Sequence, residues 1–421
     1  MSEPNADMGV KISRALFLAL ALFALTGGGA LGDDGTLVLR TSRILDGRGG
    51  VLEDRDILVR GSEIAEIVTR GTATGDRVYD LTGLTVLPGY IDTHVHISHH
   101  FDPNGKLHPP DDRDDTDHVT LYAVENAYRT LLSGVTTVQS LGREEDAALK
   151  KWIARGVVPG PRVLSSLGAV RENTGSPEAI RDFVRARKAA GADVVKIFAS
   201  TSIRLGGVTN MSAEQLGAAC GEARAQGLRS IVHAHRPDGI ELAANAGCSQ
   251  IEHAWLADRE ALEVIARSGM YLGNQIDLLF RNYAEHGERF DGVGSYTLEG
   301  FANLQEARAG ALRVFQDSLT ISGLALVYNT DANAGAHGQN AEEIVAYVTQ
   351  GGQSPMNAVV AATSRAAESL GLGDRIGAIA PGMDADVIAL DGDPLVDPEA
   401  FRRVVFVMRA GKVYRSESGT R

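Results

Sequence analysis

The chain has 421 residues and a formal net charge of −13 at pH 7, with 44% hydrophobic and 23% charged residues. This balance is ordinary for a globular protein and excludes wholesale disorder. The acidic charge argues against nucleic-acid binding, which normally depends on basic patches. The two cysteines, Cys220 and Cys248, exclude a disulfide scaffold and a cysteine-rich zinc module, and we expect no structural disulfide.

Residues 1–32 have the pattern of a secretory signal peptide. Lys11 and Arg14 precede the apolar run 15–25, and small residues follow it up to Gly32. The apolar run is shorter than the roughly 20 residues that span a bilayer. We therefore expect cleavage after Gly32, an exported protein that is periplasmic or extracellular, and no stable membrane insertion after cleavage. An uncleaved membrane anchor is the alternative.

Short predicted strands occupy both ends of the remaining chain. In residues 33–88, apolar residues alternate with polar ones, and Asp46-Gly47 and Arg60-Gly61 mark turns. A similar pattern fills residues 374–421. Because these segments flank a long middle part, they predict one small β-sandwich formed by both chain ends.

The middle part, residues 89–373, alternates strands with helices. Capping patterns at Ser176 and Ser212 mark two helix starts. The predicted strands are 84–96, 135–139, 162–166, 194–198, 230–235, 250–253, 271–275 and 325–330. Eight strands alternating with helices predict an α/β fold, a (β/α)8 TIM-like barrel.

Two segments of this middle part are predicted as long loops, residues 99–117 and 277–296. We expect Tyr283 and Tyr296 of the second loop to pack against an apolar group of a substrate. The histidines in or near the first loop are expected in a lid or at the surface. They are His99, His100, His108 and His118.

Metal-binding side chains stand at the ends of predicted strands. His94 and His96 share one face of the first strand, since side chains alternate along a strand. A lysine among Val and Ile at a strand end is costly unless it has a partner. The carboxyl ends of barrel strands converge on one face, where imidazole and carboxylate groups suit Zn²⁺. The candidate ligands are His94, His96, Lys196, His233, His253 and Asp331.

Together these motifs resemble the metal-dependent amidohydrolase superfamily, in particular its imidazolonepropionase-like and Xaa-Pro-dipeptidase-like branch. The resemblance covers most of the chain. The segments that carry it are 88–96 (PGYIDTHVH), 134–137 (GVTT), 192–197 (ADVVKI), 233–235 (HAH), 251–253 (IEH), 330–332 (TDA) and 379–386 (IAPGMDAD).

The resemblance implies a binuclear centre of two divalent ions, with Zn²⁺ expected. His94, His96 and Asp331 would hold the more buried ion, and His233 and His253 the second. Lys196 would be carboxylated by CO₂, and the resulting carbamate would bridge both ions. A metal-bridging hydroxide would be the nucleophile, and Asp331 would pass its proton to the leaving group.

Substrate-binding candidates lie beside these ligands. His235 would either hydrogen-bond the substrate or orient a neighbour, and His337 is expected at the mouth of the site. Arg171, Arg204 and Arg236 follow strands three, four and five. Each is a candidate to bind a substrate carboxylate, with an ordinary surface arginine as the alternative.

Hydrolysis of an amide bond in a small molecule, such as a dipeptide or an N-acyl amino acid, is the function that the resemblance favours. Single-metal deaminases of the superfamily usually carry a Glu where this chain has Arg236, which argues against deamination of a nucleobase. An esterase, lactonase or phosphotriesterase with the same centre is the alternative, and a non-catalytic binding barrel is disfavoured by the full ligand set. A homo-oligomer is a further expectation from the resemblance.

Overall fold

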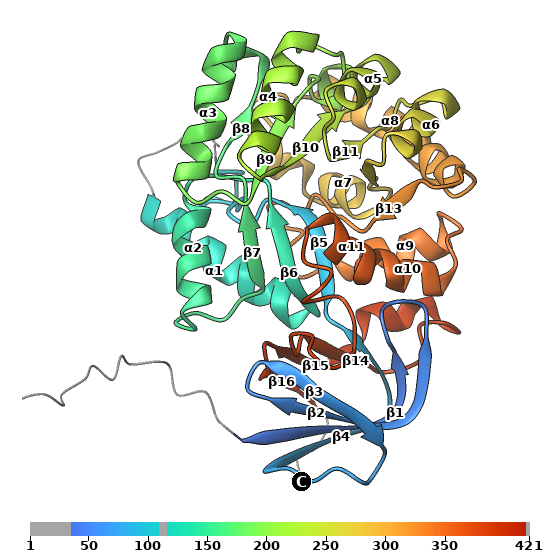
Figure 1. The fold of residues 1–421 in the computed structure, drawn as a ribbon. Coiled ribbons are helices and arrows are strands. Elements are labelled where there is room, and N and C mark those ends of the chain that lie inside the picture. Colours follow the sequence, from blue (N-terminus) through green and yellow to red (C-terminus); the bar gives the residue numbers. More distant parts are fainter. Residues whose placement is uncertain (1–34, 109–115, 418–421) are drawn as a thin grey trace, which may run out of the picture. The chain divides into compact units, whose positions relative to one another are not determined.

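The computed structural model describes residues 35–108 and 116–417 (Figure 1). The predicted leader, residues 1–32, lies outside the described residues. Within the described ranges, no helix is both long and apolar enough to cross a membrane.

Strands from both ends of the chain form one seven-stranded sheet, whose order is β16-β15-β14-β4-β1-β2-β3. β4 pairs in parallel with β1 on one side and antiparallel with β14 on the other. This central strand joins the two chain ends as expected. The prediction of a β-sandwich is wrong, however, because these strands form one sheet and not two stacked sheets. The strands are β1 (Thr36–Leu45), β2 (Val51–Arg60), β3 (Glu63–Thr69), β4 (Arg77–Pro88), β14 (Val387–Leu390), β15 (Val404–Arg409) and β16 (Lys412–Ser416).

The middle part contains two parallel sheets. The order β5-β6-β7 describes the first sheet, and β13-β12-β11-β10-β9-β8 the second. Strands β5, β6 and β11 are buried along their whole length, as is typical of parallel sheets covered on both faces. Their bounds are β5 (Tyr90–Val95), β6 (Val135–Ser140), β7 (Arg162–Ser165), β8 (Ala169–Val170), β9 (Val194–Phe198), β10 (Arg229–Ala234), β11 (Gln250–His253), β12 (Tyr271–Gly273) and β13 (Ala325–Val327).

Backbone hydrogen bonds bring the end of β5 beside the segment that follows β13. The Asp331 amide donates to the His94 carbonyl at 2.8 Å, and the His96 amide donates to the Ala332 carbonyl at 2.8 Å. No continuous ladder of strands closes a barrel within the described ranges. The α/β character of the prediction is confirmed, and the closed barrel is not found.

Helices connect and surround these strands (Figure 1). Ser176 and Ser212 cap α3 and α4 as predicted, by accepting hydrogen bonds from the amides of Ala179 and Gln215. The helices are α1 (Thr116–Leu132), α2 (Asp146–Ala154), α3 (Pro177–Ala189), α4 (Ala213–Ala225), α5 (Pro237–Asn245), α6 (Arg259–Arg267), α7 (Leu278–Phe290), α8 (Leu298–Ser318), α9 (Ala341–Thr349), α10 (Pro355–Ala362) and α11 (Ser364–Ser369), with short 3₁₀ turns η1 (Glu172–Thr174), η2 (Ile203–Leu205) and η3 (Pro398–Arg402).

Helix α7 lies inside the segment that was predicted as a loop. The buried Glu343 carboxylate on α9 accepts hydrogen bonds from the amides of Ile276, Asp277 and Leu278. These amides begin the helix and need acceptors. The cap therefore comes from a residue far along the chain, and the local sequence carries no sign of it.

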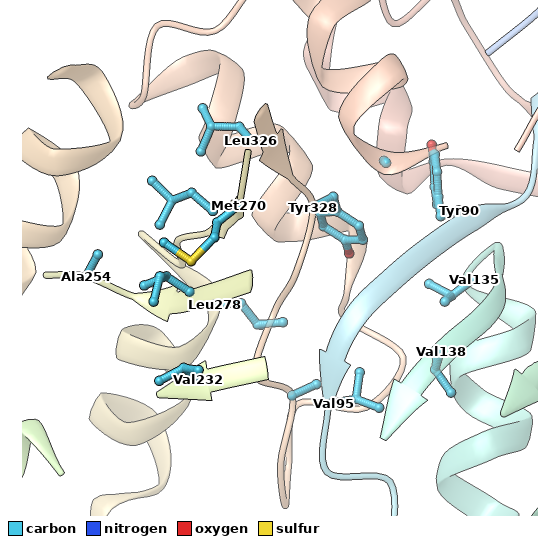
Figure 2. Packing of buried hydrophobic residues seen from close by; sticks show 14 of the residues in the cluster. Tyr90, Val95, Val135, Val138, Val232, Ala254, Met270, Leu278, Leu326 and Tyr328 are labelled. Carbon is cyan, nitrogen blue, oxygen red and sulfur yellow. The ribbon is translucent and has the colours of Figure 1, made fainter. Parts of the chain in front are cut away.

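One apolar core supports both parallel sheets. Figure 2 shows Val95, Val135 and Val138 from β5 and β6 in the same cluster as Val232 from β10 and Leu326 from β13. All five side chains are buried. The shared core fixes the strand ends that carry the candidate ligands.

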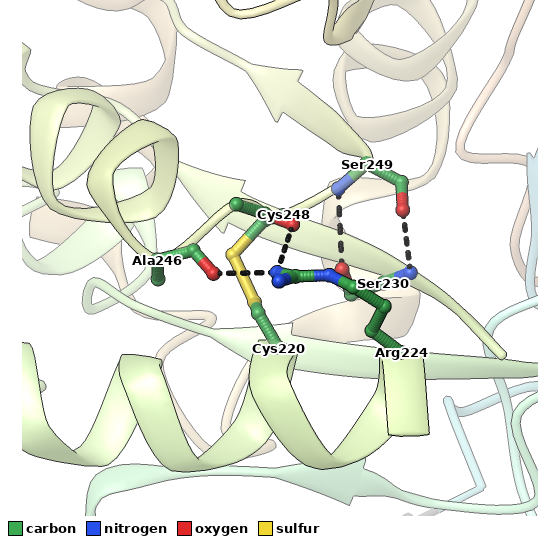
Figure 3. Close-up of a disulfide and its surroundings, with 7 residues drawn as sticks. Cys220, Arg224, Ser230, Ala246, Cys248 and Ser249 are labelled. Carbon is green, nitrogen blue, oxygen red and sulfur yellow. Dashed lines mark hydrogen bonds between the residues drawn. A yellow bond between two sulfur atoms is a disulfide. The ribbon is translucent and has the colours of Figure 1, made fainter. Parts of the chain in front are cut away.

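A disulfide joins Cys220 on α4 to Cys248 just before β11 (Figure 3), which corrects the expectation of no structural disulfide. Both cysteines are buried, and their Cα atoms lie 5.2 Å apart. The Arg224 side chain, one turn further along α4, donates to the carbonyls of Ala246 and Gly247. The fold brings together two cysteines that are 28 positions apart in the sequence. Their closeness in space cannot be inferred from the number of cysteines.

Candidate metal centre and substrate site

His94, His96 and Asp331 form the centre of the site. One ligand atom from each lies within 4.8 Å of the others. Asp331 Oδ1 is 3.0 Å from His96 Nε2 and 3.3 Å from His94 Nε2. In the described part of the chain, this is the one group of three His, Cys, Asp or Glu residues close enough to hold a metal ion.

The backbone at two candidate ligands is strained. Asp331 has φ +52° and His253 has φ +73°, both in the left-handed region that non-glycine residues rarely adopt. Such strain costs about 1–3 kcal/mol per residue and collects at functional sites. Burial alone would raise the pKa of Asp331. The His94 and His96 rings lower this pKa by more than burial raises it, so the side chain stays a carboxylate.

His233 and His253 lie beside this group. Their ring centroids are 4.5 Å apart, and the His253 ring is 5.6 Å from the His94 ring. His253 Nδ1 lies 2.8 Å from Gln275 Oε1, which leaves Nε2 for another ligand. His233 Nε2 contacts the Thr201 carbonyl at 3.3 Å. His253 therefore lies close to His94, and His233 lies close to His253, but the two do not form a complete ligand set of their own.

Lys196 lies in the middle of β9 and not at its end as expected; it is 1% exposed, and its Nζ has no hydrogen-bond partner among the described residues. Burial lowers the pKa of Lys196 to about 8, and the nearby carboxylates of Glu252 and Asp331 oppose this shift. A buried amine without a partner is costly, and such exceptions need an explanation. The position next to the histidines indicates a functional role.

Glu252 is a residue that the sequence reasoning missed, although it stands in the IEH segment beside His253. Its Oε2 accepts hydrogen bonds from His94 Nδ1 at 2.8 Å and from Asn329 Nδ2 at 2.5 Å. Burial raises the pKa of Glu252 to about 8, and Lys196 opposes the shift. A Cβ on Gly273 would lie 2.2 Å from Asn329 Nδ2, so the glycine leaves the space that Asn329 fills.

Asp92 is a second missed residue, two positions before His94. Its carboxylate is buried and accepts hydrogen bonds from the backbone amides of His94 and Thr330, the Thr330 hydroxyl and the Asn340 amide group. Burial raises the pKa of Asp92 to about 7 against these bonds. Asp92 therefore ties the segment that carries His94 to the segment that carries Asp331.

His235 and Trp255 carry buried ring nitrogens that have no hydrogen-bond partner among the described residues, and His337 is buried as well. The His235 ring lies 5.1 Å from that of His253 and 5.2 Å from that of Trp255. Burial, with a contribution from His96, lowers the pKa of His337 to about 3. Neutral imidazole and indole nitrogens without partners can bind a polar ligand at this place.

The loop histidines differ from the expectation of a lid or surface position. His100 and His108 are buried, because His100 stacks on Tyr122 of α1 and on His108. His99 stacks on His96 with a centroid distance of 4.6 Å. His118 is exposed, as expected.

The three candidate arginines have different surroundings. Arg171 and Arg236 are exposed. The Arg171 guanidinium lies 3.8 Å from the Phe198 ring centroid, and Arg236 donates to the Gly206 carbonyl. Arg204 is half-buried, and its guanidinium lies 3.9 Å from the ring centroid of Tyr296.

Several known proteins are similar to this chain. An ochratoxinase from Aspergillus niger is 29% identical over 296 residues, which are 64% of this chain and 59% of that protein. The chain thus spans about three fifths of the length of that curated relative. A Xaa-Pro dipeptidase crystal structure with bound methionine matches at a TM-score of 0.81 and 24% identity, covering 90% of this chain and all of that one. The crystal structure of A. niger ochratoxinase matches at a TM-score of 0.77 and 22% identity, covering 91% of this chain and 96% of that one.

The family model described as "Amidohydrolase family" matches residues 85–414, which include β5 to β15 and every candidate ligand. This match covers well over half of the 421 residues. The chain belongs to the amidohydrolase family.

Proposed function

We propose that the protein is a metal-dependent hydrolase that cleaves a C–N amide bond of a small substrate. The observation that carries the proposal is the convergence of His94, His96 and Asp331 beside the buried Lys196. The amidohydrolase family is typically metal-dependent, and the proteins similar to this chain include an ochratoxinase and a Xaa-Pro dipeptidase. Dipeptides and N-acyl amino acids are the proposed substrates. We also propose that the two parallel sheets are parts of one (β/α)8 barrel.

Two divalent ions, Zn²⁺ by preference, are the proposed cofactor. Imidazole nitrogens and a carboxylate that stays ionised suit this ion. His94, His96 and Asp331 would hold one ion, and His233 and His253 the other. When bound, two such ions lower the pKa of water and polarise a carbonyl group.

Carboxylation of Lys196 by CO₂ is part of the proposal. Only a neutral amine reacts with CO₂, and burial that lowers the pKa of Lys196 to about 8 makes this form accessible near neutral pH. The carbamate would be an anion, which suits a cation site better than a buried ammonium group does.

The chain's own residues would share the remaining work. Asp331 would accept a proton from the attacking water and return it to the leaving amine. The two ring nitrogens of His235 have no hydrogen-bond partner in the described part of the chain, and one of them would donate a hydrogen bond to the substrate. Since the His253 and Trp255 rings pack beside it, His235 would be held in position.

Export is proposed on the leader pattern and is supported by the disulfide between Cys220 and Cys248. Disulfides persist in oxidising compartments and are rare in the cytosol. The homo-oligomer remains a prediction.

A substrate panel tests the proposed reaction. The purified protein should be assayed against dipeptides, N-acyl amino acids, lactones, carboxylic esters and phosphotriesters under identical conditions. We expect turnover of at least one amide class. Fast lactone or phosphotriester hydrolysis without amide turnover would contradict the proposal and favour the alternative chemistry.

A further inference from the structure

The Arg204 side chain is held in one position beside the candidate site. Its guanidinium lies 3.9 Å from the ring centroid of Tyr296 and 5.7 Å from that of Tyr283. Its Nε donates a hydrogen bond to the Ser295 hydroxyl at 3.0 Å, and the Asn303 amide group binds the Arg204 carbonyl. Aromatic faces attract a guanidinium through the charge distribution of the ring. The contacts on both side chain and backbone restrict the orientation of this arginine.

The Arg204 guanidinium forms no ion pair with a carboxylate among the residues that the structure describes, although Tyr296, Tyr283 and the Asp331 carboxylate lie near enough to raise its pKa against the effect of burial. Several other half-buried arginines do have one: Arg162, for example, pairs with Asp384 and Asp386 at 2.7 and 2.8 Å. A cation held in place without an anion is suited to bind an anionic ligand, and the planar fork of arginine matches a carboxylate.

Two contacts connect Arg204 to the candidate catalytic residues. The Tyr283 and Tyr296 hydroxyls lie 2.9 Å apart, and Asn333 Nδ2 donates to the Tyr283 hydroxyl at 2.8 Å. The network therefore ends at Asn333, which stands two residues after Asp331 in the chain.

On the other side, the loop that carries Arg204 packs against His235. Gly207 follows η2, and a Cβ at this glycine would lie 2.9 Å from the His235 Cβ. Gly207 also has φ +60°, which favours glycine. The loop therefore comes close to a histidine whose ring nitrogens have no partner. Arg204 is also near enough to His235 to lower the pKa of that ring, after the larger effects of burial and His253.

We propose that Arg204 binds a free carboxylate of the substrate and makes the enzyme selective for amides whose amine half is an α-amino acid. This inference rests on the proposed amide hydrolysis and names its substrate class. The rings of Tyr283 and Tyr296 beside the guanidinium favour an amino acid with an apolar side chain. Arg236 is less suited to this role, because it is exposed and donates to a backbone carbonyl.

Binding of L-phenylalanine and L-phenylalaninol to the metal-loaded protein tests the role of Arg204. The two ligands differ only in the carboxylate, and neither contains a hydrolysable bond. Isothermal titration should be run on the wild-type protein, Arg204→Met, Arg204→Lys and Arg155→Met. Arg155 is a matched control, since it is exposed and its guanidinium stacks 4.9 Å from the Trp152 ring on α2.

The wild-type protein and Arg155→Met should bind L-phenylalanine at least tenfold more tightly than L-phenylalaninol, as a charged hydrogen-bond pair predicts. Arg204→Met should lose this preference, and Arg204→Lys should keep part of it, since it retains the charge. A contact between the carboxylate of L-phenylalanine and the metal ions would be present in both Arg204→Met and Arg155→Met. Such a contact therefore cannot cause a difference between these two variants. An unchanged preference in Arg204→Met, or equal or absent binding of both ligands by the wild-type protein, would overturn the inference.

Benzoate release from N-benzoyl-L-phenylalanine separates this inference from the proposed reaction. If the carboxylate preference follows Arg204 but no amide is cleaved, the proposed reaction fails and the anion site stands. If amides are cleaved and the preference does not depend on Arg204, the reaction stands and the anion site fails.

Discussion

The Glu252 carboxylate accepts a hydrogen bond from Nδ1 of His94 at 2.8 Å, and both side chains are buried. A histidine that donates through one ring nitrogen has a fixed tautomer and presents the other nitrogen to a metal ion. The side-chain amides of Asn329 and Gln250 hold Glu252 from other directions. This arrangement orients His94 before any ligand binds.

Replacing Glu252 by Gln should therefore weaken metal binding. The substitution keeps the size of the side chain but replaces its carboxyl group with an amide, and loss of such an outer partner typically costs 10–100-fold in metal affinity. Zinc affinity should be measured by competition with a chelator. Glu260→Gln is the control, because Glu260 is exposed on α6. Equal affinity in the Glu252→Gln and wild-type proteins would show that Glu252 does not orient His94 for a metal.

Removal of the disulfide should lower stability without moving the site. A crosslink across 28 residues is expected to contribute about 3 kcal/mol, mainly by restricting the unfolded chain. We expect Cys220→Ala/Cys248→Ala to unfold at a lower denaturant concentration than the oxidised wild-type protein. Reductant should destabilise the wild-type protein and leave the double variant unchanged. Two reactive thiols in the unreduced, denatured wild-type protein would refute the disulfide.

Glu343 should make stability depend on pH. Burial raises its pKa from 4.5 to about 8 against the backbone hydrogen bonds that it accepts. Between pH 4.5 and about 8, the folded state therefore binds more protons than the unfolded state. The contribution of Glu343 to the free energy of unfolding falls as the pH rises through this range. Glu343→Gln should show a weaker decline in unfolding free energy over this range.

Denaturant unfolding at several pH values measures this effect. Glu306→Gln is the control, because Glu306 is exposed on α8 and should leave the pH profile unchanged. The assignment fails if the profiles of Glu343→Gln and the wild-type protein coincide.

Much of the fold could be predicted from local patterns. Alternating strands and helices indicated the α/β class, and the Ser176 and Ser212 caps were located correctly. Helix α7 was missed because its cap, Glu343, comes from α9. The disulfide was missed because the distance between Cys220 and Cys248 depends on the fold.

The candidate site was predictable where its residues form recognisable motifs. The structure brings His94, His96 and Asp331 together from segments more than 200 residues apart in sequence. Glu252 and Asp92 stand inside the same motifs but were missed, because their roles depend on hydrogen bonds to neighbours distant in sequence. Their burial among ligand-bearing strands could not be inferred from residue type alone.

Lys196→Ala tests the proposed bridge between the two halves of the site. Removing this side chain should release metal and abolish activity, since no other described side chain would supply the bridging anion. Short carboxylic acids added to the variant should restore part of the activity. Full activity of Lys196→Ala without such an additive would exclude the proposed carbamate.

The metal content of the purified protein tests the central claim most directly. Elemental analysis of the chain as isolated should find about two zinc ions per subunit. Chelation should remove them together with amide hydrolysis, and added Zn²⁺ should restore both. A metal-free protein that retains full hydrolytic activity would contradict the account.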